Sequence, residues 1–336
     1  MSATQAGPDV LVGIGRIREA AATLRGVAVR TPLVGFGPAA DRRFLKAESL
    51  QPIGAFKIRG AYVAVASLTP EERARGVITY SSGNHAQGVA RAARLLGAPA
   101  VIVMPSDAPR IKRDRVVADG AEIVEVGTAS DERRDVAERI AAERGLAVIP
   151  PFDDDRVIAG QGTVGLEIAE ELPDVAAVLV PVGGGGLASG VAAAIRAVVP
   201  GARVIGVESV LAADARDSLA AGRIVAWPAA DVSRTIADGT RTQSLGPRTF
   251  AHMSRLLDSI VTVTEAEIAA AVRLAAEESR LVVEPSGALS VAALAFHSGE
   301  LGLDRIERPV VAVVSGGNVD PDQYRELLAA PIPGRA

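Results

Sequence analysis

Residues 76–105 read GVITYSSGNHAQGVARAARLLGAPAVIVMP. Two short apolar runs, at 76–80 and 100–105, enclose an Ala-rich segment at 85–97 whose apolar residues recur at helical spacing. A strand, a helix and a second strand in this order form a β-α-β unit, in which parallel strands share one sheet and the helix covers it. This stretch therefore predicts an α/β fold with a parallel sheet.

The same alternation continues along the chain. A helix-like segment at 111–120 precedes a strand-like run at 122–126. A second series begins with VAAVLVPV at 175–182, after which strand-like and Ala-rich segments alternate as far as PVVAVVS at 309–315, except for an irregular stretch from about 221 to 248. Two series of this kind predict two doubly wound α/β lobes.

Composition narrows the classes of function. The chain has 336 residues, 49% of them hydrophobic, a net charge of −4 and no cysteine. Its basic residues are interspersed with acidic ones, which argues against nucleic acid as a partner and favours a small-molecule ligand. Without cysteine, disulfides and thiolate chemistry are excluded. With no basic, apolar leader and no run of about 18 apolar residues, we expect no membrane segment and a cytoplasmic location.

Lysine is rare in this chain. Lys46, Lys57 and Lys112 are the only lysines among 36 basic residues, and the others are arginine. Only a primary amine deprotonates readily and forms a Schiff base, so a lysine retained in such a background is a candidate for that chemistry. Chance retention is the alternative for each one.

Three loops carry the candidate chemistry. Gly183 to Gly186 follow a predicted strand and open a helix near Leu187, which suits a phosphate, although a tight turn or a dinucleotide site using Gly183, Gly185, Ala188 and Glu208 fits as well. Ser81 to His85 follow another strand and suit a carboxylate, or else a serine N-cap. Lys57 lies in the first turn of a predicted helix that runs toward Ala66, where the helix N-terminus is expected to lower its pKa; a solvated lysine is the alternative.

A phosphate cradle, a carboxylate loop and a poised lysine are together what a pyridoxal phosphate enzyme needs. From about residue 10 to 325 the chain resembles the fold-type II pyridoxal phosphate enzymes, specifically the threonine/serine dehydratase and serine racemase group. The motifs that carry this resemblance are ESLQPIGAFKIRGA, SSGNHAQGVA, VIAGQGTVGLEI, PVGGGGLASG, TIADG, VVEPSGA and VVSGGNVD, in the family's order.

The resemblance implies a role for each matching position. Lys57 would carry the cofactor and remove the Cα proton, and Phe56 would pack on the cofactor ring. Ser315 would face the pyridine nitrogen with a neutral hydroxyl, which favours elimination over transamination. The other implied cofactor contacts are Asn84 with the ring hydroxyl, Glu284 nearby, and Gly183, Gly184, Gly185, Gly186 and Leu187 with the phosphate.

The resemblance also implies the surroundings of the cofactor. The substrate would contact Ser81, Ser82, Asn84, His85 and Arg134, and Mg²⁺ or Ca²⁺ would bind Glu208, Ala212 and Asp214, although a solvated helix face and two solvated acids are the respective alternatives. The expected architecture is that of the tryptophan synthase β-subunit, with a large pyridoxal-phosphate-binding domain (1–69 and 152–336) and a small domain inserted at 70–151. A homodimer is expected.

The implied reaction is elimination of water from threonine or serine. Ser82 lies where racemase-like members have a hydroxyl on the ring face opposite Lys57, whereas dedicated threonine dehydratases resemble SAGNH. Serine racemisation and elimination from threo-3-hydroxyaspartate therefore stay open. The chain departs from the family at Ala55 and Val63, where serine and asparagine are usual, and this puts the substrate preference in doubt.

Rival interpretations use the same residues differently. A β-replacement or threonine synthase reaction would need the same lysine together with a second nucleophile or a phosphorylated substrate. A nicotinamide-binding oxidoreductase or a non-catalytic ligand sensor would use the glycine loop and Glu208, but leaves Lys57 and Ser315 unexplained.

Overall fold

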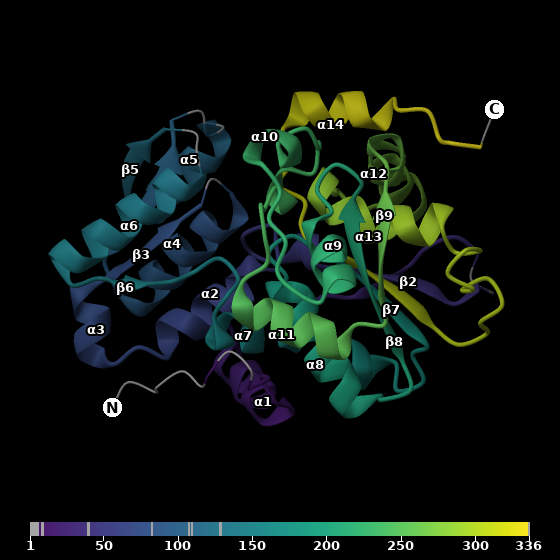
Figure 1. Ribbon diagram of the computed structural model, residues 1–336, viewed down its shortest axis with the longest axis horizontal. Coiled ribbons are helices and arrows are strands. Elements are labelled where there is room, and N and C mark those ends of the chain that lie inside the picture. Colours follow the sequence, from purple (N-terminus) through teal and green to yellow (C-terminus); the bar gives the residue numbers. More distant parts are fainter. Residues whose placement is uncertain are drawn as a thin grey trace.

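The computed structural model describes residues 7, 10–38, 41–81, 83–106, 108, 110–127 and 130–334. They form two α/β lobes, as predicted, and Figure 1 shows the smaller lobe on the left and the larger on the right. Among the described helices, none combines the length and the apolar character needed to cross a membrane.

The larger lobe is built on a six-stranded sheet in the order β1-β2-β10-β7-β8-β9. All neighbouring strands are parallel except β1, which pairs antiparallel with β2 at the edge. The strands are β1 (Leu33–Gly35), β2 (Arg43–Ala47), β7 (Ala177–Pro181), β8 (Arg203–Ser209), β9 (Ser259–Val263) and β10 (Val310–Val314). The N-terminal strand pair was not predicted from the sequence.

Helices cover both faces of this sheet. Val311 and Val313 of β10 pack into a core with α7 and α8, whereas Val310, Ala312 and Val314 pack into a second core with α12 and α13. This alternation follows from the opposite directions of successive strand side chains. The helices are α1 (Ile14–Thr23), α2 (Lys57–Ala66), α7 (Asp155–Glu171), α8 (Gly186–Val198), α9 (Asp214–Ala221), α10 (Ala229–Val232), α11 (Pro247–Leu256), α12 (Glu265–Ser279), α13 (Pro285–Phe296) and α14 (Pro321–Leu328).

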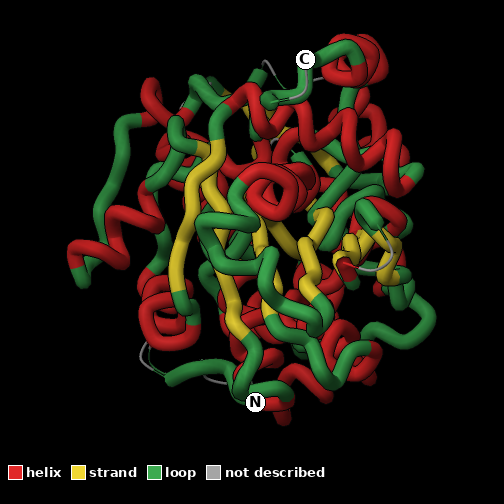
Figure 2. Tube along the Cα trace, turned by 90° about the vertical axis from the view of Figure 1, so that its right-hand side faces the viewer, coloured by secondary structure: helices red, strands yellow, loops and turns green. Residues whose placement is uncertain are grey.

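The smaller lobe is a four-stranded parallel sheet in the order β5-β4-β3-β6. Its elements are α3 (Pro70–Arg75), β3 (Val77–Tyr80), α4 (Asn84–Leu96), β4 (Ala100–Pro105), α5 (Arg110–Ala118), β5 (Glu122–Val126), α6 (Ser130–Arg144) and β6 (Ala147–Val148). In Figure 2 the larger lobe faces the viewer, and its strands, in yellow, lie among the helices, in red. The strands and helices predicted for the smaller lobe between 76 and 126 are confirmed, and α3, α6 and the short β6 were not part of the predicted series.

The irregular stretch predicted from about 221 to 248 contains short helical pieces. The 3₁₀ helix η3 (Asp238–Thr240) lies there, in addition to α10, and a second 3₁₀ helix, η2 (Glu48–Leu50), follows β2. Helices α7 and α8 approach closely because Gly190 has no side chain. A Cβ atom at Gly190 would lie 2.4 Å from the carbonyl oxygen of Ile158 in α7. This contact fixes the start of α8 and the glycine loop before it.

Candidate functional site

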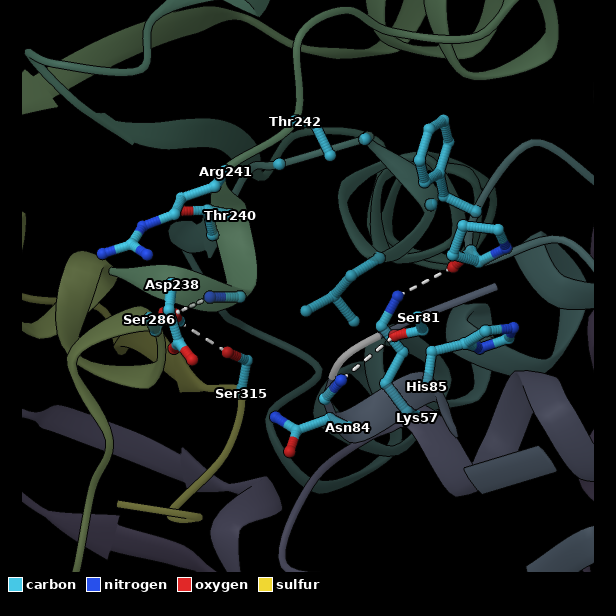
Figure 3. Close-up of a pocket in the computed structure, with 18 of the residues that line it drawn as sticks. Lys57, Ser81, Asn84, His85, Asp238, Thr240, Arg241, Thr242, Ser286 and Ser315 are labelled. Atoms are coloured by element: carbon cyan, nitrogen blue, oxygen red, sulfur yellow. Dashed lines mark hydrogen bonds between the residues drawn. The ribbon is translucent and has the colours of Figure 1, made fainter. Parts of the chain in front are cut away.

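A cavity of about 300 Å³ lies at the carboxyl ends of the central strands of both sheets. Ser81 follows β3, Gly183 follows β7 and Ser315 follows β10, and all three line it. Lys57, Ser81, Asn84 and His85 lie on one side of the space, and Asp238, Ser286 and Ser315 lie on the other (Figure 3). The structure thus brings the three predicted loops together, as expected for ligand sites of open α/β sheets.

Lys57 begins α2, as predicted, and its side chain enters the cavity. Its Nζ donates a hydrogen bond to the carbonyl oxygen of Pro151 at 2.7 Å and lies 5.2 Å from the centre of the Phe56 ring. Burial lowers the pKa of Lys57 to about 8. The pKa falls as expected, but burial, rather than the helix N-terminus, is the main cause. A larger neutral fraction makes this amine a better nucleophile and base.

The glycine loop leaves space for a ligand at the start of α8. Gly185 is the N-cap residue with a φ of 85°, and no side chain caps the helix. A Cβ atom at Gly184 would lie 2.2 Å from the Phe152 ring. The backbone N–H groups at this helix end, together with the helix dipole, suit a phosphate. The loop therefore fits the anionic part of pyridoxal phosphate.

Asn84 connects the two lobes across the cavity. Its side-chain Nδ2 donates to Glu284 Oε1 at 2.6 Å, and its Oδ1 accepts from Asn318 Nδ2 at 2.8 Å. Glu284 is 3% exposed, and burial, aided by the negative charge of Asp238, raises its pKa to about 7. Asn84 thus pairs with Glu284, so both predicted cofactor contacts lie together.

Ser315 lies directly after β10 and is buried. Its Oγ donates to the Ser286 carbonyl oxygen at 3.4 Å, and its own carbonyl oxygen accepts from the Phe56 N–H at 3.0 Å. The second bond ties the turn before Lys57 to the end of β10. A neutral hydroxyl and the lysine are therefore held in a fixed relation in one cavity.

The Ser81 to His85 loop begins α4. Ser81 Oγ accepts from the N–H of Gly83 at 3.3 Å, and His85 Nε2 lies 3.0 Å from the Ile149 carbonyl oxygen. Burial, and then the charge of Lys57, lower the pKa of His85 to about 3, so its imidazole is neutral. Ser82 lies outside the described residues.

Arg134 also lines the cavity, from α6. Its side chain is 51% exposed and lies 3.6 Å from the carboxylate of Asp135. Arg134 therefore lies on a solvated helix face, which was one interpretation of the sequence. It also lines the cavity.

Glu208, Ala212 and Asp214 lie outside the lining of this cavity, around the end of β8. Glu208 accepts hydrogen bonds from the N–H groups of Ala215 and Arg216 at 3.0 and 2.8 Å. Both carboxylate oxygens of Asp214 are buried without a hydrogen-bond partner, and burial raises its pKa to about 7. Burial, with the neighbouring charge of Asp214, raises the pKa of Glu208 as well.

Around the end of β8, Glu208 and Asp214 are the two carboxylates that the described chain offers to a metal ion. Within the described chain, no group of three or more His, Cys, Asp or Glu side chains is arranged to hold a metal ion. Two buried carboxylates plus a backbone carbonyl still supply oxygen ligands of the kind that Mg²⁺ and Ca²⁺ prefer. The unpartnered oxygens of Asp214 fit such an ion.

Several lining residues were not assigned a role from the sequence. They are Tyr80, Lys112, Arg133, Pro151, Phe152, Pro181, Ser286 and the segment 238–244. The rarity of lysine singled out Lys112, and the TIADG motif included Asp238, but neither was placed in the site. Pro151 and Phe152 gave no signal, because their role depends only on where the chain passes Lys57 and the glycine loop.

Comparisons with known proteins agree with this geometry. The profile of the family "Pyridoxal-phosphate dependent enzyme" matches residues 25–316. The chain is 40% identical over 325 residues to L-threo-3-hydroxyaspartate ammonia-lyase of Saccharomyces cerevisiae, covering 96% of this chain and 95% of that protein. It is 43% identical over 322 residues to L-threonine ammonia-lyase of Thermotoga maritima, covering 95% and 78%. The structure of maize serine racemase superposes with a TM-score of 0.89 at 37% identity, covering 94% and 97%.

Proposed function

This chain belongs to the pyridoxal-phosphate dependent enzymes, and from that premise we propose that it eliminates water from a small β-hydroxy amino acid, such as threonine or serine, to give a 2-oxo acid and ammonia. One observation carries the proposal. A half-buried lysine with a lowered pKa and no carboxylate partner among the described residues shares a cavity with an uncapped helix N-terminus. An aldehyde cofactor with a phosphate tail needs both features.

The proposed cofactor contacts follow the lining of the cavity. Lys57 would hold the cofactor covalently, with Phe56 against its ring, Asn84 near the ring hydroxyl, Ser315 near the pyridine nitrogen and Glu284 beside them. The phosphate would rest on Gly183, Gly184, Gly185, Gly186 and Leu187. When bound, pyridoxal phosphate supplies an electron-withdrawing ring that acidifies the Cα proton of the substrate.

Residues of the chain would also bind the substrate and accept its proton. The α4 N-terminus, with Ser81, Ser82, Asn84 and His85, would bind the substrate carboxylate, and Arg134 would lie at the entrance. Lys57 Nζ, once released by the substrate amine, would accept the Cα proton, because its pKa of about 8 leaves part of the amine neutral. A neutral Ser315 hydroxyl favours loss of the β-hydroxyl over transamination.

The proposal also includes a cation site, a division into two domains, a cellular location and an oligomeric state. The two buried carboxylates Glu208 and Asp214, with the Ala212 carbonyl, support a Mg²⁺ or Ca²⁺ site. All four strands of the smaller sheet fall within residues 77–148, which supports a small domain at 70–151 inserted between 1–69 and 152–336. A cytoplasmic homodimer is proposed from the family resemblance.

The reaction and the lysine can be tested together. After borohydride reduction of the purified enzyme, we expect a pyridoxyl adduct on the peptide that contains Lys57. Lys46 and Lys112 serve as internal controls, because only one lysine should carry the adduct. Ammonia release from a β-hydroxy amino acid without a second substrate distinguishes elimination from β-replacement. An adduct on another lysine, or no adduct, would overturn the proposal.

The comparisons leave the side chain of the substrate open. The relatives' names divide between L-threo-3-hydroxyaspartate and L-threonine, and a solved neighbour is a serine racemase. Racemisation is a second candidate function, because both the Ser81 to His85 loop and Lys57 border the cavity. Conversion of L-serine to D-serine, followed by chiral chromatography, tests it.

A further inference from the structure

In the described chain, one side of the cavity lacks branched aliphatic side chains and carries three cations, Lys112, Arg133 and Arg134. The elements β3, α4, α5 and α6, together with the loop before α4, contribute eight described lining residues, and none of these has the side chain of Val, Leu or Ile. They are Tyr80, Ser81, Gly83, Asn84, His85, Lys112, Arg133 and Arg134. We call Tyr80, Lys112, Arg133 and Arg134 the cationic wall.

Lys112 is the most enclosed cation of this wall. Its side chain is 11% exposed, and its Nζ lies 2.5 Å from Asp238 Oδ2 of the larger lobe. The same Nζ lies 3.7 Å from the position that a Cβ atom would take at Gly83. Lys112 therefore borders the loop proposed to bind the α-carboxylate, and without substrate its charge is compensated by a carboxylate from across the cavity.

Tyr80 brings a neutral donor to the same wall. It ends β3 directly before Ser81, and burial raises the pKa of its phenol, so the hydroxyl keeps its proton at neutral pH. The positive charge of Arg134 acts on this phenol from α6. The negative charges of Glu138 and Asp153 also act on the phenol, and Tyr80 and Arg134 both line the cavity.

These groups decide what kind of side chain the substrate can carry. A methyl group, as in threonine, would meet hydrogen-bond donors and separate them from water without replacing their bonds, which is unfavourable. A carboxylate would accept hydrogen bonds from an ammonium, a guanidinium or a phenol, and charge-assisted bonds of this type are the stronger ones. The wall is thus complementary to an anion.

We propose that the cationic wall binds a second carboxylate of the substrate, so that this chain prefers β-hydroxy amino dicarboxylates of the 3-hydroxyaspartate type over serine and threonine. In this proposal the carboxylate of Asp238 occupies, in the free protein, the place beside Lys112 that the second carboxylate takes in the complex. The inference rests on the proposed elimination reaction and names its substrate class.

The chemical step is balanced as for any β-hydroxy amino acid. The Cα–H and Cβ–O bonds break, the Cα proton passes to Lys57, and the leaving hydroxyl takes up one proton, so that the substrate loses one water in total. Uptake of one water then releases ammonia and 2-oxobutanedioate. No oxidant or reductant takes part.

A substrate panel tests the class directly. The holoenzyme is assayed for ammonia release from threo-3-hydroxyaspartate, serine and threonine. We expect kcat/KM for the dicarboxylate to exceed the other two by about tenfold to a hundredfold, the effect of one or two charge-assisted hydrogen bonds. A higher value for serine or threonine would overturn this inference and leave the proposed function intact. No ammonia from any of the three would refute the proposed function itself.

Binding without turnover gives a second measurement. Succinate and butyrate have four carbons each but two and one carboxylates. Calorimetric titration of the holoenzyme should give a Kd for succinate about tenfold or more below that for butyrate. Equal affinities would contradict the proposal.

Two substitutions separate a binding role from a merely structural bridge between the lobes. Lys112→Met should lower the ratio of kcat/KM for threo-3-hydroxyaspartate over serine at least about tenfold, whereas Asp238→Asn should leave this ratio unchanged or raise it, because it removes the competing carboxylate. If the pair only holds the lobes together, both variants will impair all substrates equally and the ratio will not move. Arg139→Met, which changes an exposed arginine of α6 paired with Glu143, is the matched control.

Discussion

Lys57 and Arg59 lie two residues apart in α2, yet only the charge of Arg59 is neutralised by neighbouring carboxylates. Arg59 is 1% exposed and binds the carboxylates of Glu48 and Glu167 at 2.8 and 2.6 Å. Lys57 enters the cavity, where its Nζ donates a hydrogen bond to the Pro151 carbonyl oxygen and pairs with no carboxylate of the described residues. One side of the helix is thus neutralised by carboxylates, and the other carries an amine without one.

The buried network around Arg59 extends to the second lysine of the chain. Lys46 is fully buried, and its Nζ lies 2.7 Å from Glu167 and donates to the Thr31 carbonyl oxygen at 2.6 Å. The network joins β2, η2, α2 and α7. Compensated charges therefore fix the position of α2, while the uncompensated amine is available for chemistry. Lys46 is more deeply buried than Lys57 but is paired with a carboxylate. The missing counter-charge, and not burial, therefore distinguishes the lysine proposed to be catalytic.

Lys57→Ala should have the largest effect on activity. Without the amine, the chain loses both the covalent attachment of the cofactor and the base, so ammonia release should fall by at least about 10⁴-fold. Circular dichroism should remain that of the wild type, because no carboxylate loses its partner. Elimination at near wild-type rate by this variant would break the contrast between Lys57 and Arg59.

Arg59→Met should act on stability instead. Removing the guanidinium leaves the buried carboxylate of Glu48 without its main counter-charge, which costs about 3 to 5 kcal/mol. Urea denaturation should show this loss in the free energy of unfolding, and Arg59→Lys should recover part of it by restoring a charge. A fully stable Arg59→Met protein would mean that the network does not hold α2.

The pH dependence of the cofactor-free protein sharpens the comparison further. The pKa of Lys57 is lowered from 10.5 to about 8, so between these values the unfolded chain binds more protons than the folded one. The free energy of unfolding should therefore rise with pH from about 8 to 10.5, by about 3 kcal/mol in total. This contribution is lost as the pH falls through 8.

Lys57→Met isolates that contribution. Subtracting the unfolding free energies of this variant from those of the wild type at each pH removes the titration of every other group. A difference that stays constant from pH 8 to 10.5 would show that the amine is not desolvated in the folded protein.

The fold was predictable because its signal is local. The runs that became β3, β4, β7, β8 and β10 are buried and rich in Val and Ile, and helical segments separate them. Strand β1 escaped prediction because it has only three residues, and β2 because its apolar residues are interrupted by Arg43 and Lys46. Lys46, in β2, is buried only because α7 supplies Glu167 more than a hundred residues later.

The site was predictable to the extent that its residues follow strands or begin helices. Gly183, Ser81 and Ser315 obey this rule, and Lys57 was singled out by its type. Pro151 and Phe152 could not be found in this way, because their contacts with Lys57 and Gly184 exist only in the folded chain. The cause of the lowered pKa of Lys57 was also misjudged, since the extent of its burial is a tertiary property.

The smallest expected effect concerns a second pair of buried charges, Glu208 and Asp214. Glu208 accepts two backbone hydrogen bonds and is partly compensated by the charge of Arg216, whereas both oxygens of Asp214 lack hydrogen-bond partners in the described structure. A divalent cation bound by Asp214 and Glu208 should therefore stabilise the protein. Millimolar Mg²⁺ or Ca²⁺ should raise the free energy of unfolding by about 1 to 3 kcal/mol if its concentration exceeds Kd by about ten- to hundredfold.

Asp214→Asn should abolish this stabilisation, because an amide in place of the carboxylate removes the negative charge that attracts the ion. Asp217→Asn is the matched control: Asp217 lies in the same helix, but it is partly exposed and already binds Arg216 and Trp227. It should respond to the cation as the wild type does. If thermal melts of Asp214→Asn and the wild type shift equally with Mg²⁺ and with Ca²⁺, the ion binds elsewhere, and the unpartnered carboxylate of Asp214 would need another explanation.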